Sequence, residues 1–266
     1  MSLANIQVDV ATRLGAVTKP TATGFNGIDR LLSGGLRPGT VLALTGQPGS
    51  GRTSLALMVA YMAARASAGV VFATRGLEET ELVARLTARA LRRAYPASEV
   101  TYGDILSGSA LVNDAVRKAV SEALETVVDK VGAHLHFARV AGRDSLSTLI
   151  ERSTQLFARY ERVVLVVDDI EGLAVNDGGD FDGALVRTAY ELRQLADQGS
   201  VVVFTALERH MERVAPAASM LVSVASQPSE DGKAVPVSLI VRKNRLGPGG
   251  TLRLNALFGA SEFSDA

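Results

Sequence analysis

The stretch Gly46-Gln47-Pro48-Gly49-Ser50-Gly51-Arg52-Thr53 decides the fold of this chain. It follows the apolar run 41–45 and precedes the segment 53–66, which is apolar almost all round, so the order is strand, glycine loop and buried helix. In this setting backbone N–H groups and a helix N-terminus bind phosphates, and a threonine hydroxyl binds Mg²⁺. The alternative is a glycine turn that only joins two core elements. The stretch predicts a nucleotide site with the candidate residues Gly46, Gln47, Pro48, Gly49, Ser50, Gly51, Arg52, Thr53 and Ser54.

One position of this loop departs from the phosphate-binding pattern G-x-x-x-x-G-K-[ST], because Arg52 stands where the pattern has lysine. A guanidinium group is planar, bulkier than an ammonium group and spreads its charge. Arg52 can therefore still hold phosphates, but it is poorly shaped to follow a γ-phosphoryl group as it is transferred. We expect nucleotide binding with slow or absent hydrolysis.

Composition narrows the class of protein. With 266 residues and 47% hydrophobic content, the chain is long enough for one large α/β domain with a sizeable core. Lys and Arg number 28, as do Asp and Glu, so no bulk positive charge indicates nucleic acid or an anionic membrane. The absence of cysteine excludes disulfides and thiolate chemistry. No apolar run reaches the roughly 18 residues of a membrane-spanning helix. We therefore expect a cytoplasmic protein without a membrane partner.

Further apolar runs alternate with amphipathic segments along the chain. The runs predict strands at residues 70–74, 135–140, 163–167 and 201–205, and helical periodicity predicts helices near 79–95, 116–131, 146–157 and 185–195. Strands that alternate with helices form a parallel sheet covered on both faces. In the last third, residues 220–224, 235–242 and 251–258 read as short strands joined by turns. They predict an antiparallel extension of the same sheet.

The domain organisation is simple. No Pro- or Ser-rich linker and no internal repeat divides the chain, so residues 21–266 are expected to form one domain. Residues 1–20 carry Leu3, Ile6, Val10 and Leu14 at helical spacing, which predicts a short linker-like helix that ends before Pro20. Such a helix packs either on its own domain or on a neighbouring copy of the chain.

Two carboxylates are candidates for metal binding and catalysis. Asp168 ends the strand at 163–167, at the carboxyl edge where ligands gather in open α/β sheets, and there it can hold a Mg²⁺ ion together with Thr53. Glu78 lies just past the second strand, at the same edge, and can polarise the water that attacks a γ-phosphate. The alternatives are a helix or turn cap at Asp168 and an acidic first helical turn at Glu78.

A pair of cations on a turn completes the candidates. Lys243 and Arg245 follow the apolar segment 237–241 and precede a Gly- and Pro-rich turn at 247–250. Cations at the end of a sheet can reach a γ-phosphate, in the same subunit or across an interface. The alternative is an ordinary solvated turn.

Taken together, these stretches resemble the ATPase domain of the DnaB-type replicative helicases, within the RecA superfamily. The resemblance covers nearly the whole chain from Thr23. Its carriers are Thr23-Gly24-Phe25 with Ile28-Asp29, Gly34 to Gly39, the glycine loop, Leu77-Glu78 with Leu82 and Arg85-Leu86, Gly103-Asp104-Ile105, the strand that ends at Asp168, and Lys243-Asn244-Arg245 with Gly247, Pro248, Gly250 and Thr251. RadA-like and KaiC-like ATPases stay open as near relatives.

The resemblance implies a RecA-like P-loop NTPase fold: an α/β domain with a mainly parallel, twisted sheet, helices on both faces and an antiparallel C-terminal extension. It implies ATP and Mg²⁺ as ligands of the glycine loop, Thr53 and Asp168 at the metal, and Glu78 as the catalytic acid–base residue. It also implies that Lys243 and Arg245 act as finger residues, which contact the γ-phosphate bound by a neighbouring subunit. A homo-oligomeric ring of six would follow.

Besides Arg52, three features depart from the helicase pattern. Thr205-Ala206 replaces a polar Ser-Gln pair, so a sensor of the γ-phosphate is missing. The segment 174–183, which corresponds to a DNA-facing loop, carries Asp177, Asp180 and Asp182 but no Lys or Arg, and acidic groups repel phosphates. The N-terminal domain of the helicases has no counterpart in the sequence.

These departures favour an ATP-binding, assembly-forming module with slow or absent hydrolysis and weak binding of single-stranded DNA. One alternative is an active ATP-driven translocase on single-stranded DNA that serves DNA replication. The other is a KaiC-like or RadA-like ATPase that acts on a protein partner.

Overall fold

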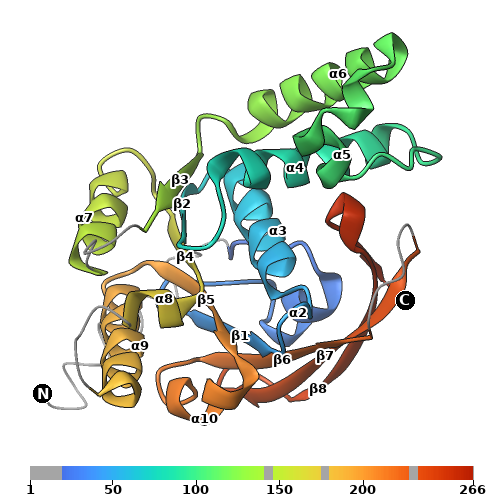
Figure 1. Ribbon diagram of the computed structural model, residues 1–266. Coiled ribbons are helices and arrows are strands. Elements are labelled where there is room, and N and C mark those ends of the chain that lie inside the picture. Colours follow the sequence, from blue (N-terminus) through green and yellow to red (C-terminus); the bar gives the residue numbers. More distant parts are fainter. Residues whose placement is uncertain (1–19, 141–145, 175–179, 228–232, 266) are drawn as a thin grey trace, which may run out of the picture.

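The computed structural model describes residues 20–140, 146–174, 180–227 and 233–265 of the chain. In this part, the strands form a nine-stranded sheet in the order β3-β2-β4-β5-β1-β6-β7-β8-β9 (Figure 1). The strands are β1 (Val41–Gly46), β2 (Gly69–Thr74), β3 (Leu135–Arg139), β4 (Val163–Asp168), β5 (Val201–Leu207), β6 (Met220–Ser226), β7 (Val235–Asn244), β8 (Gly250–Leu257) and β9 (Glu262–Asp265).

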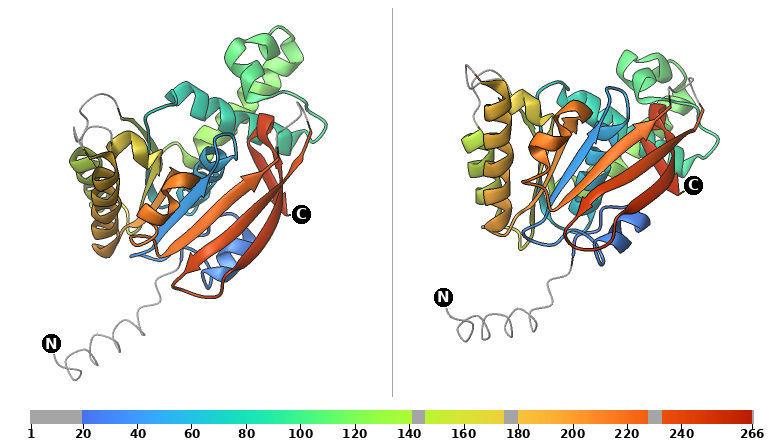
Figure 2. Two further views of the ribbon diagram at one scale, coloured as in Figure 1. Left: turned by 60° about the horizontal axis from the view of Figure 1, so that its bottom comes forward. Right: turned by 90° about the horizontal axis from the view of Figure 1, so that it is seen from below.

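Strand direction divides the sheet into two parts. The neighbours from β3 to β6 pair in parallel, whereas β6 to β9 pair antiparallel. The antiparallel strands continue the same sheet beyond β6 and carry the C-terminus at its far edge (Figure 2). The parallel core and the antiparallel extension are both confirmed.

Helices cover the two faces of the sheet. They are α2 (Asn26–Leu31), α3 (Arg52–Arg65), α4 (Glu79–Ala94), α5 (Tyr102–Ser107), α6 (Asp114–Val131), α7 (Leu146–Leu156), α8 (Ile170–Ala174), α9 (Phe181–Asp197) and α10 (Met211–Val214), with 3-10 turns η1 (Ser109–Leu111), η3 (Glu208–His210) and η4 (Phe258–Ala260). Two separate cores result, because successive residues of a strand point to opposite faces.

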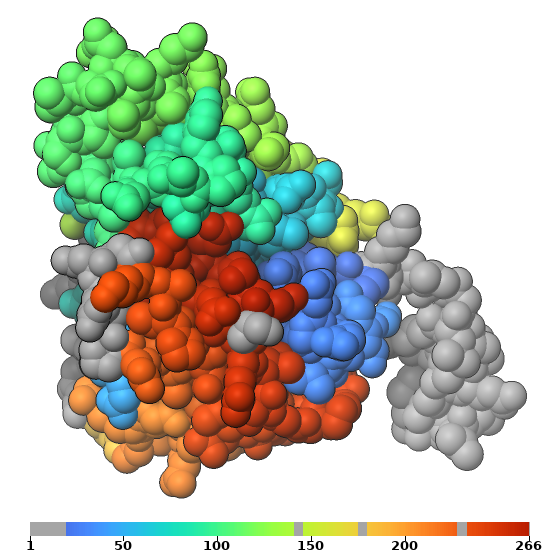
Figure 3. Space-filling model, turned by 90° about the vertical axis from the view of Figure 1, so that its right-hand side faces the viewer, coloured from blue at the N-terminus to red at the C-terminus, as the bar shows by residue number. Residues whose placement is uncertain are grey.

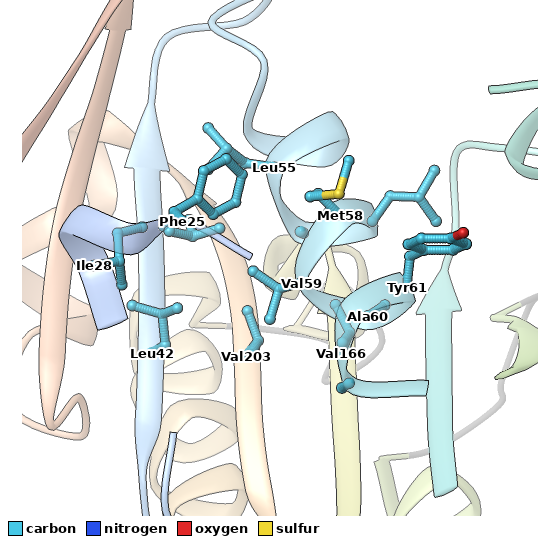
Figure 4. Close-up of a cluster of buried hydrophobic side chains, with 14 of the residues drawn as sticks. Phe25, Ile28, Leu42, Leu55, Met58, Val59, Ala60, Tyr61, Val166 and Val203 are labelled. Atoms are coloured by element: carbon cyan, nitrogen blue, oxygen red, sulfur yellow. The ribbon is translucent and has the colours of Figure 1, made fainter. Parts of the chain in front are cut away.

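The core on the α3 face explains why α3 is apolar all round. Leu42 and Leu44 of β1 point to this face, whereas Val41 and Ala43 point to the core beneath α7 and α9. Side chains of α3 such as Leu55 and Val59 pack over Leu42, Val203 and Val166 (Figure 4). Covered by the sheet on one side and by α4 and α6 on the other, α3 keeps few exposed residues.

Short elements escaped the sequence prediction. The helices α2, α5, α8 and α10 and the strand β9 span only four to six residues, too few for a periodic pattern. Helix α5 is set locally by a capping box, in which Thr101 accepts from the amide of Asp104 and the Asp104 carboxylate accepts from the amide of Thr101. The helix expected within residues 1–20 lies outside the described residues.

Candidate nucleotide-binding site

The glycine loop joins β1 to α3 and needs its glycines. Gly49 and Gly51 have φ angles of +80° and +91°, in the region that disfavours residues with a side chain. A Cβ at Gly46 would lie 2.5 Å from both the Ser50 hydroxyl and the carbonyl oxygen of Val224. Gly51 is the N-cap of α3, and no side chain caps the first turn of this helix. The backbone N–H groups of that turn are therefore placed to bind an anion.

A hydrogen-bonded group of three side chains lies next to this loop. The Thr53 hydroxyl, in the first turn of α3, donates to Oδ1 of Asp168 over 3.0 Å. Thr205, on β5, donates to the same oxygen over 2.9 Å, and its own oxygen accepts from the amide of Asp169 over 3.0 Å. The structure thus brings Thr53 and Asp168 together as the sequence predicts. It also adds Thr205, which the sequence analysis considered only as part of a missing sensor.

The electrostatics of Asp168 suit a cation. Burial raises the pKa of this carboxyl, while the hydrogen bonds from Thr205 and Thr53 and the charges of Arg52 and Arg85 act in the opposite direction. Its hydrogen-bond partners Thr53 and Thr205 are both hydroxyl groups. Carboxylate and hydroxyl oxygens are ligands that Mg²⁺ accepts, so the donor set at Thr53 and Asp168 fits this ion.

Arg85 is a residue of the site that the sequence analysis quoted only as part of a motif. Its Nη1 donates to the Ser54 hydroxyl over 3.2 Å, and its guanidinium carbon lies 4.2 Å from the centre of the Tyr102 ring. An ion pair of 2.8 Å with Glu81 fixes the other end of the guanidinium. The hydroxyl oxygen of the buried Ser54 thus accepts a hydrogen bond from Arg85.

Glu78 lies past the carboxyl end of β2, which pairs with β4 so that Thr74 is opposite Asp168. Its side chain is 71% exposed, and its carboxylate lies 4.0 Å from Nη1 of Arg139 at the end of β3. The structure records no contact between Glu78 and Arg52, Thr53 or Asp168. The residue is at the expected edge of the sheet, where its side chain faces solvent.

Lys243 and Arg245 lie near the start of β1, at the end of the strands opposite to the one that carries the glycine loop. Strand β7 runs antiparallel to β6, and Asn244 pairs with Met220, which in turn pairs with Leu42 at the start of β1. Four residues of β1, or about 13 Å, separate Leu42 from Gly46 at the glycine loop. Lys243 donates to the carbonyl oxygens of Ala215 and Pro216, and Arg245 donates to that of Pro216. The structure does not bring these cations to the glycine loop of the same chain.

A buried acidic residue and a histidine lie near Asp168, just after the end of β4. Oε1 of Glu171 accepts from the amide of Leu207 over 2.6 Å and lies 2.8 Å from Nδ1 of His210. Arg209 donates from Nε to Nε2 of the same imidazole over 3.2 Å. These contacts hold the segment after β5 against the residues that follow β4. No sequence pattern predicts them.

The acidic segment 174–183 of the sequence analysis contacts a basic residue that follows β5. Arg213 of α10 forms an ion pair with Asp182 in the first turn of α9. Asp177 lies outside the described residues, and Asp180 is the N-cap of α9. The Asp182 carboxylate is thus partly neutralised by a basic residue of the same chain.

A cavity of about 510 Å³ opens beside the first half of the glycine loop, on its β6 side. Its polar residues include Glu208, Ser223 and Arg242, where Ser223 donates to Glu208 over 3.0 Å and accepts from Arg242 over 3.3 Å. The loop therefore has Asp168 on one side and an open cavity with a few polar side chains on the other.

Two features are absent from the described residues. None of their His, Asp and Glu side chains gather in groups of three or more that could hold a metal ion. Among the same residues, no helix is long and apolar enough to cross a membrane.

Comparison with known proteins identifies relatives of the chain. A family model described as "ATPase: KaiC" matches residues 21–216. The DNA repair protein RadA of Mycobacterium tuberculosis, from strains CDC 1551 and H37Rv, is 48% identical over 44 residues. That segment is 16% of this chain and 9% of the length of these curated relatives.

Solved structures share the fold. A structure described as an ATPase domain superimposes with a TM-score of 0.81 at 17% identity, over 100% of this chain and 99% of that one. A DnaB-like replicative helicase, described together with its interactions with primase, gives a TM-score of 0.81 at 16% identity, over 98% of this chain and 68% of that one. At this level of identity the likeness shows the RecA-like fold alone.

Proposed function

The chain belongs to the KaiC family of ATPases, and from this premise we propose that it binds ATP with Mg²⁺ and hydrolyses it slowly or not at all. It is a RecA-like module, related in family or fold to KaiC, RadA and the DnaB-like helicases. In this proposal, residues 21–266 work as one ATPase domain whose bound nucleotide controls assembly.

The observation that carries the proposal is the pairing of Thr53 with Asp168 at the uncapped N-terminus of α3. The N–H groups of residues 49–54 would hold the phosphates, while Thr53 and Asp168 would hold the ion. Mg²⁺ would neutralise charge on the phosphates. The positive charge of Arg52 acts on Asp168 in the structure, which supports a place for Arg52 beside the same phosphates.

Three features support slow turnover. Arg52 replaces the lysine that follows the γ-phosphoryl group. Ala206 has no polar group, and the hydroxyl of its neighbour Thr205 is bonded to Asp168 and Asp169. The side chain of Glu78 is 71% exposed and its carboxylate lies 4.0 Å from Arg139, so no recorded contact holds it beside Thr53 and Asp168. Together these features favour a site that retains ATP.

The position of Lys243 and Arg245 supports action across an interface. Because the register of β7 places them at the edge opposite the glycine loop, they would reach a γ-phosphate only in a neighbouring subunit. A ring of the chain, with six subunits as the expected number, would supply that arrangement. The two cations would exchange the carbonyl oxygens of Ala215 and Pro216 for the phosphate of the neighbour.

The charge distribution favours a protein partner over DNA. The ion pair of Arg213 with Asp182 reduces the positive charge that the segment after β5 offers to a phosphate backbone. The KaiC family match supports the same alternative, an ATPase that acts on a protein. An active translocase on single-stranded DNA would need free basic residues on these segments, where the charge of Arg213 is already paired with Asp182.

Light scattering and DNA binding test the proposed function together. We expect ATP with Mg²⁺ to increase the molar mass of the wild-type protein measured by size-exclusion chromatography with light scattering, and EDTA to reverse the change. A fluorescent single-stranded oligonucleotide should bind with a Kd weaker than about 10 µM at physiological salt. Salt-dependent binding at low micromolar Kd or tighter would favour the translocase instead, and a mass independent of nucleotide would contradict the assembly role.

A further inference from the structure

A second cavity, of about 360 Å³, is lined by residues of α3, α4 and α6, and Figure 1 shows α4 and α6 above the upper end of α3. We call it the arginine cavity and define it by Tyr61, Arg65, Arg89, Arg93, Tyr95 and Lys130. Arg65 ends α3, whose other end begins at the glycine loop, so α3 separates the two sites by about 20 Å. The arginine cavity is therefore distinct from the nucleotide-binding site.

Most of its cations have a local explanation, but Arg89 does not. Arg65, Arg93 and Lys130 lie in the last turns of their helices, where positive charge complements the helix dipole. Arg89 lies in the interior of α4 and is only 6% exposed. A helix dipole has little effect there, so another interaction must account for a buried guanidinium.

Arg89 has cationic and aromatic neighbours instead of an acceptor. Its guanidinium carbon lies 5.1 Å from the centre of the Tyr61 ring, and that of Arg65 lies 5.9 Å from the same ring. The Nε atom of Arg89 is buried and has no hydrogen-bond partner among the described residues. Burial and then the charge of Arg93 lower the pKa of Arg89 to about 10, so it remains charged at neutral pH.

The carboxylates nearby form their ion pairs with other cations, although the charge of Glu262 also acts on Arg89. Glu262, at the start of β9, forms an ion pair of 3.1 Å with the half-exposed Arg93. The contact joins α4 to the C-terminal strand, and Figure 3 shows the red C-terminal part of the chain directly below the teal and green helical region that includes α4. Glu122 lines the cavity, but its recorded ion pair is with Lys118, at 3.9 Å. Four cations and one carboxylate thus line a recess whose most buried cation has no carboxylate partner in the part of the chain that the structure describes.

We propose that the arginine cavity binds a phosphate-bearing small molecule, either inorganic phosphate or a phosphate ester, whose oxygens accept hydrogen bonds from Arg89 and Arg93. Guanidinium groups present paired donors that match a phosphate. The volume is in the range of small-molecule sites. Tyr95, which is 48% exposed, offers an aromatic face to the organic part of an ester. A recess of this size suits a small molecule better than a protein surface.

The experiment titrates the wild-type protein with inorganic phosphate and with ribose 5-phosphate at constant ionic strength, by thermal unfolding and calorimetry. At a tenfold excess over Kd, the ligand should raise Tm by about 3 °C. Arg89→Met should weaken binding at least tenfold, and the exposed Arg93→Met should weaken it less. Arg253→Met, an exposed arginine of β8, is the matched control and should leave binding unchanged.

Two further comparisons make the result decisive. Arg89→Met should be at least as stable as the wild type without ligand, because it removes an unpaired buried charge and keeps an apolar side chain over Tyr61. Arg52→Met shows how much phosphate the glycine loop binds. The proposal would be overturned by a wild type that does not respond to either ligand, by a response lost only in Arg52→Met, or by binding of an acidic peptide without binding of phosphate. Tighter binding of ribose 5-phosphate supports an ester, and equal binding supports inorganic phosphate.

Discussion

Arg52→Lys is expected to raise kcat for ATP hydrolysis by about 10- to 100-fold, which corresponds to about 1.4–2.8 kcal/mol of transition-state stabilisation. A lysine ammonium group is a compact point charge that can stay on the γ-phosphoryl group as its bond breaks, whereas the broad guanidinium of Arg52 cannot follow it as closely. Phosphate release measured at saturating ATP and Mg²⁺, in wild type and variant, checks this result.

Two companion variants show whether the gain arises at the phosphates. Arg30→Lys makes the same chemical change on the exposed surface of α2 and should leave kcat at the wild-type value. Adding Glu78→Gln to Arg52→Lys should remove the gain, since the attacking water then loses its base. Equal kcat in wild type and Arg52→Lys would contradict the role assigned to Arg52.

Thr53→Val and Asp168→Asn are each expected to weaken ATP binding in Mg²⁺ at least tenfold, and to change it little in EDTA. Each removes one oxygen ligand of the ion, and the difference between the two conditions isolates the metal from the phosphate contacts of the loop. Calorimetric titration with ATP in both buffers gives the required dissociation constants.

A loss of folding stability is not expected to account for weaker ATP binding in Asp168→Asn. Burial raises the pKa of Asp168, so the stability linked to its protonated form is lost as pH rises through the folded pKa. A neutral asparagine escapes that loss, and Asp168→Asn should be at least as stable as the wild type at pH 8. Thr154→Val is the control for Thr53→Val, since the Thr154 hydroxyl donates to the carbonyl oxygen of Ile150 in its own helix. A similar loss of Mg²⁺-dependent affinity in Thr154→Val would contradict the interpretation.

The sequence was sufficient for the fold class and for the centre of the site, for physical reasons. Strands buried on both faces, such as β4, leave continuous apolar runs, and Asp168 ends one of them at the edge where the glycine loop follows β1. Because parallel strands end at the same edge, the meeting of Thr53 and Asp168 follows from their positions.

The remaining features depend on contacts between distant segments. Thr205 differs from the polar pair expected there, and only the alignment of β5 beside β4 shows that it bonds to Asp168. The place of Lys243 and Arg245 follows from the direction of β7, so an antiparallel strand carries its C-terminal cations away from the loop. In the sequence, Arg89 does not differ from the other arginines of its helix. Its burial against Tyr61 is seen only in the structure.

The fate of ATP bound to the wild-type protein tests the central claim most directly. Protein in excess over radiolabelled ATP, with Mg²⁺, is filtered to measure the bound fraction and quenched over time to measure the ratio of ADP to ATP. We expect most of the nucleotide to be bound, and to remain ATP for minutes or longer. Conversion to ADP within about a second, at the typical kcat of enzymes, would contradict the account, as would the absence of bound nucleotide.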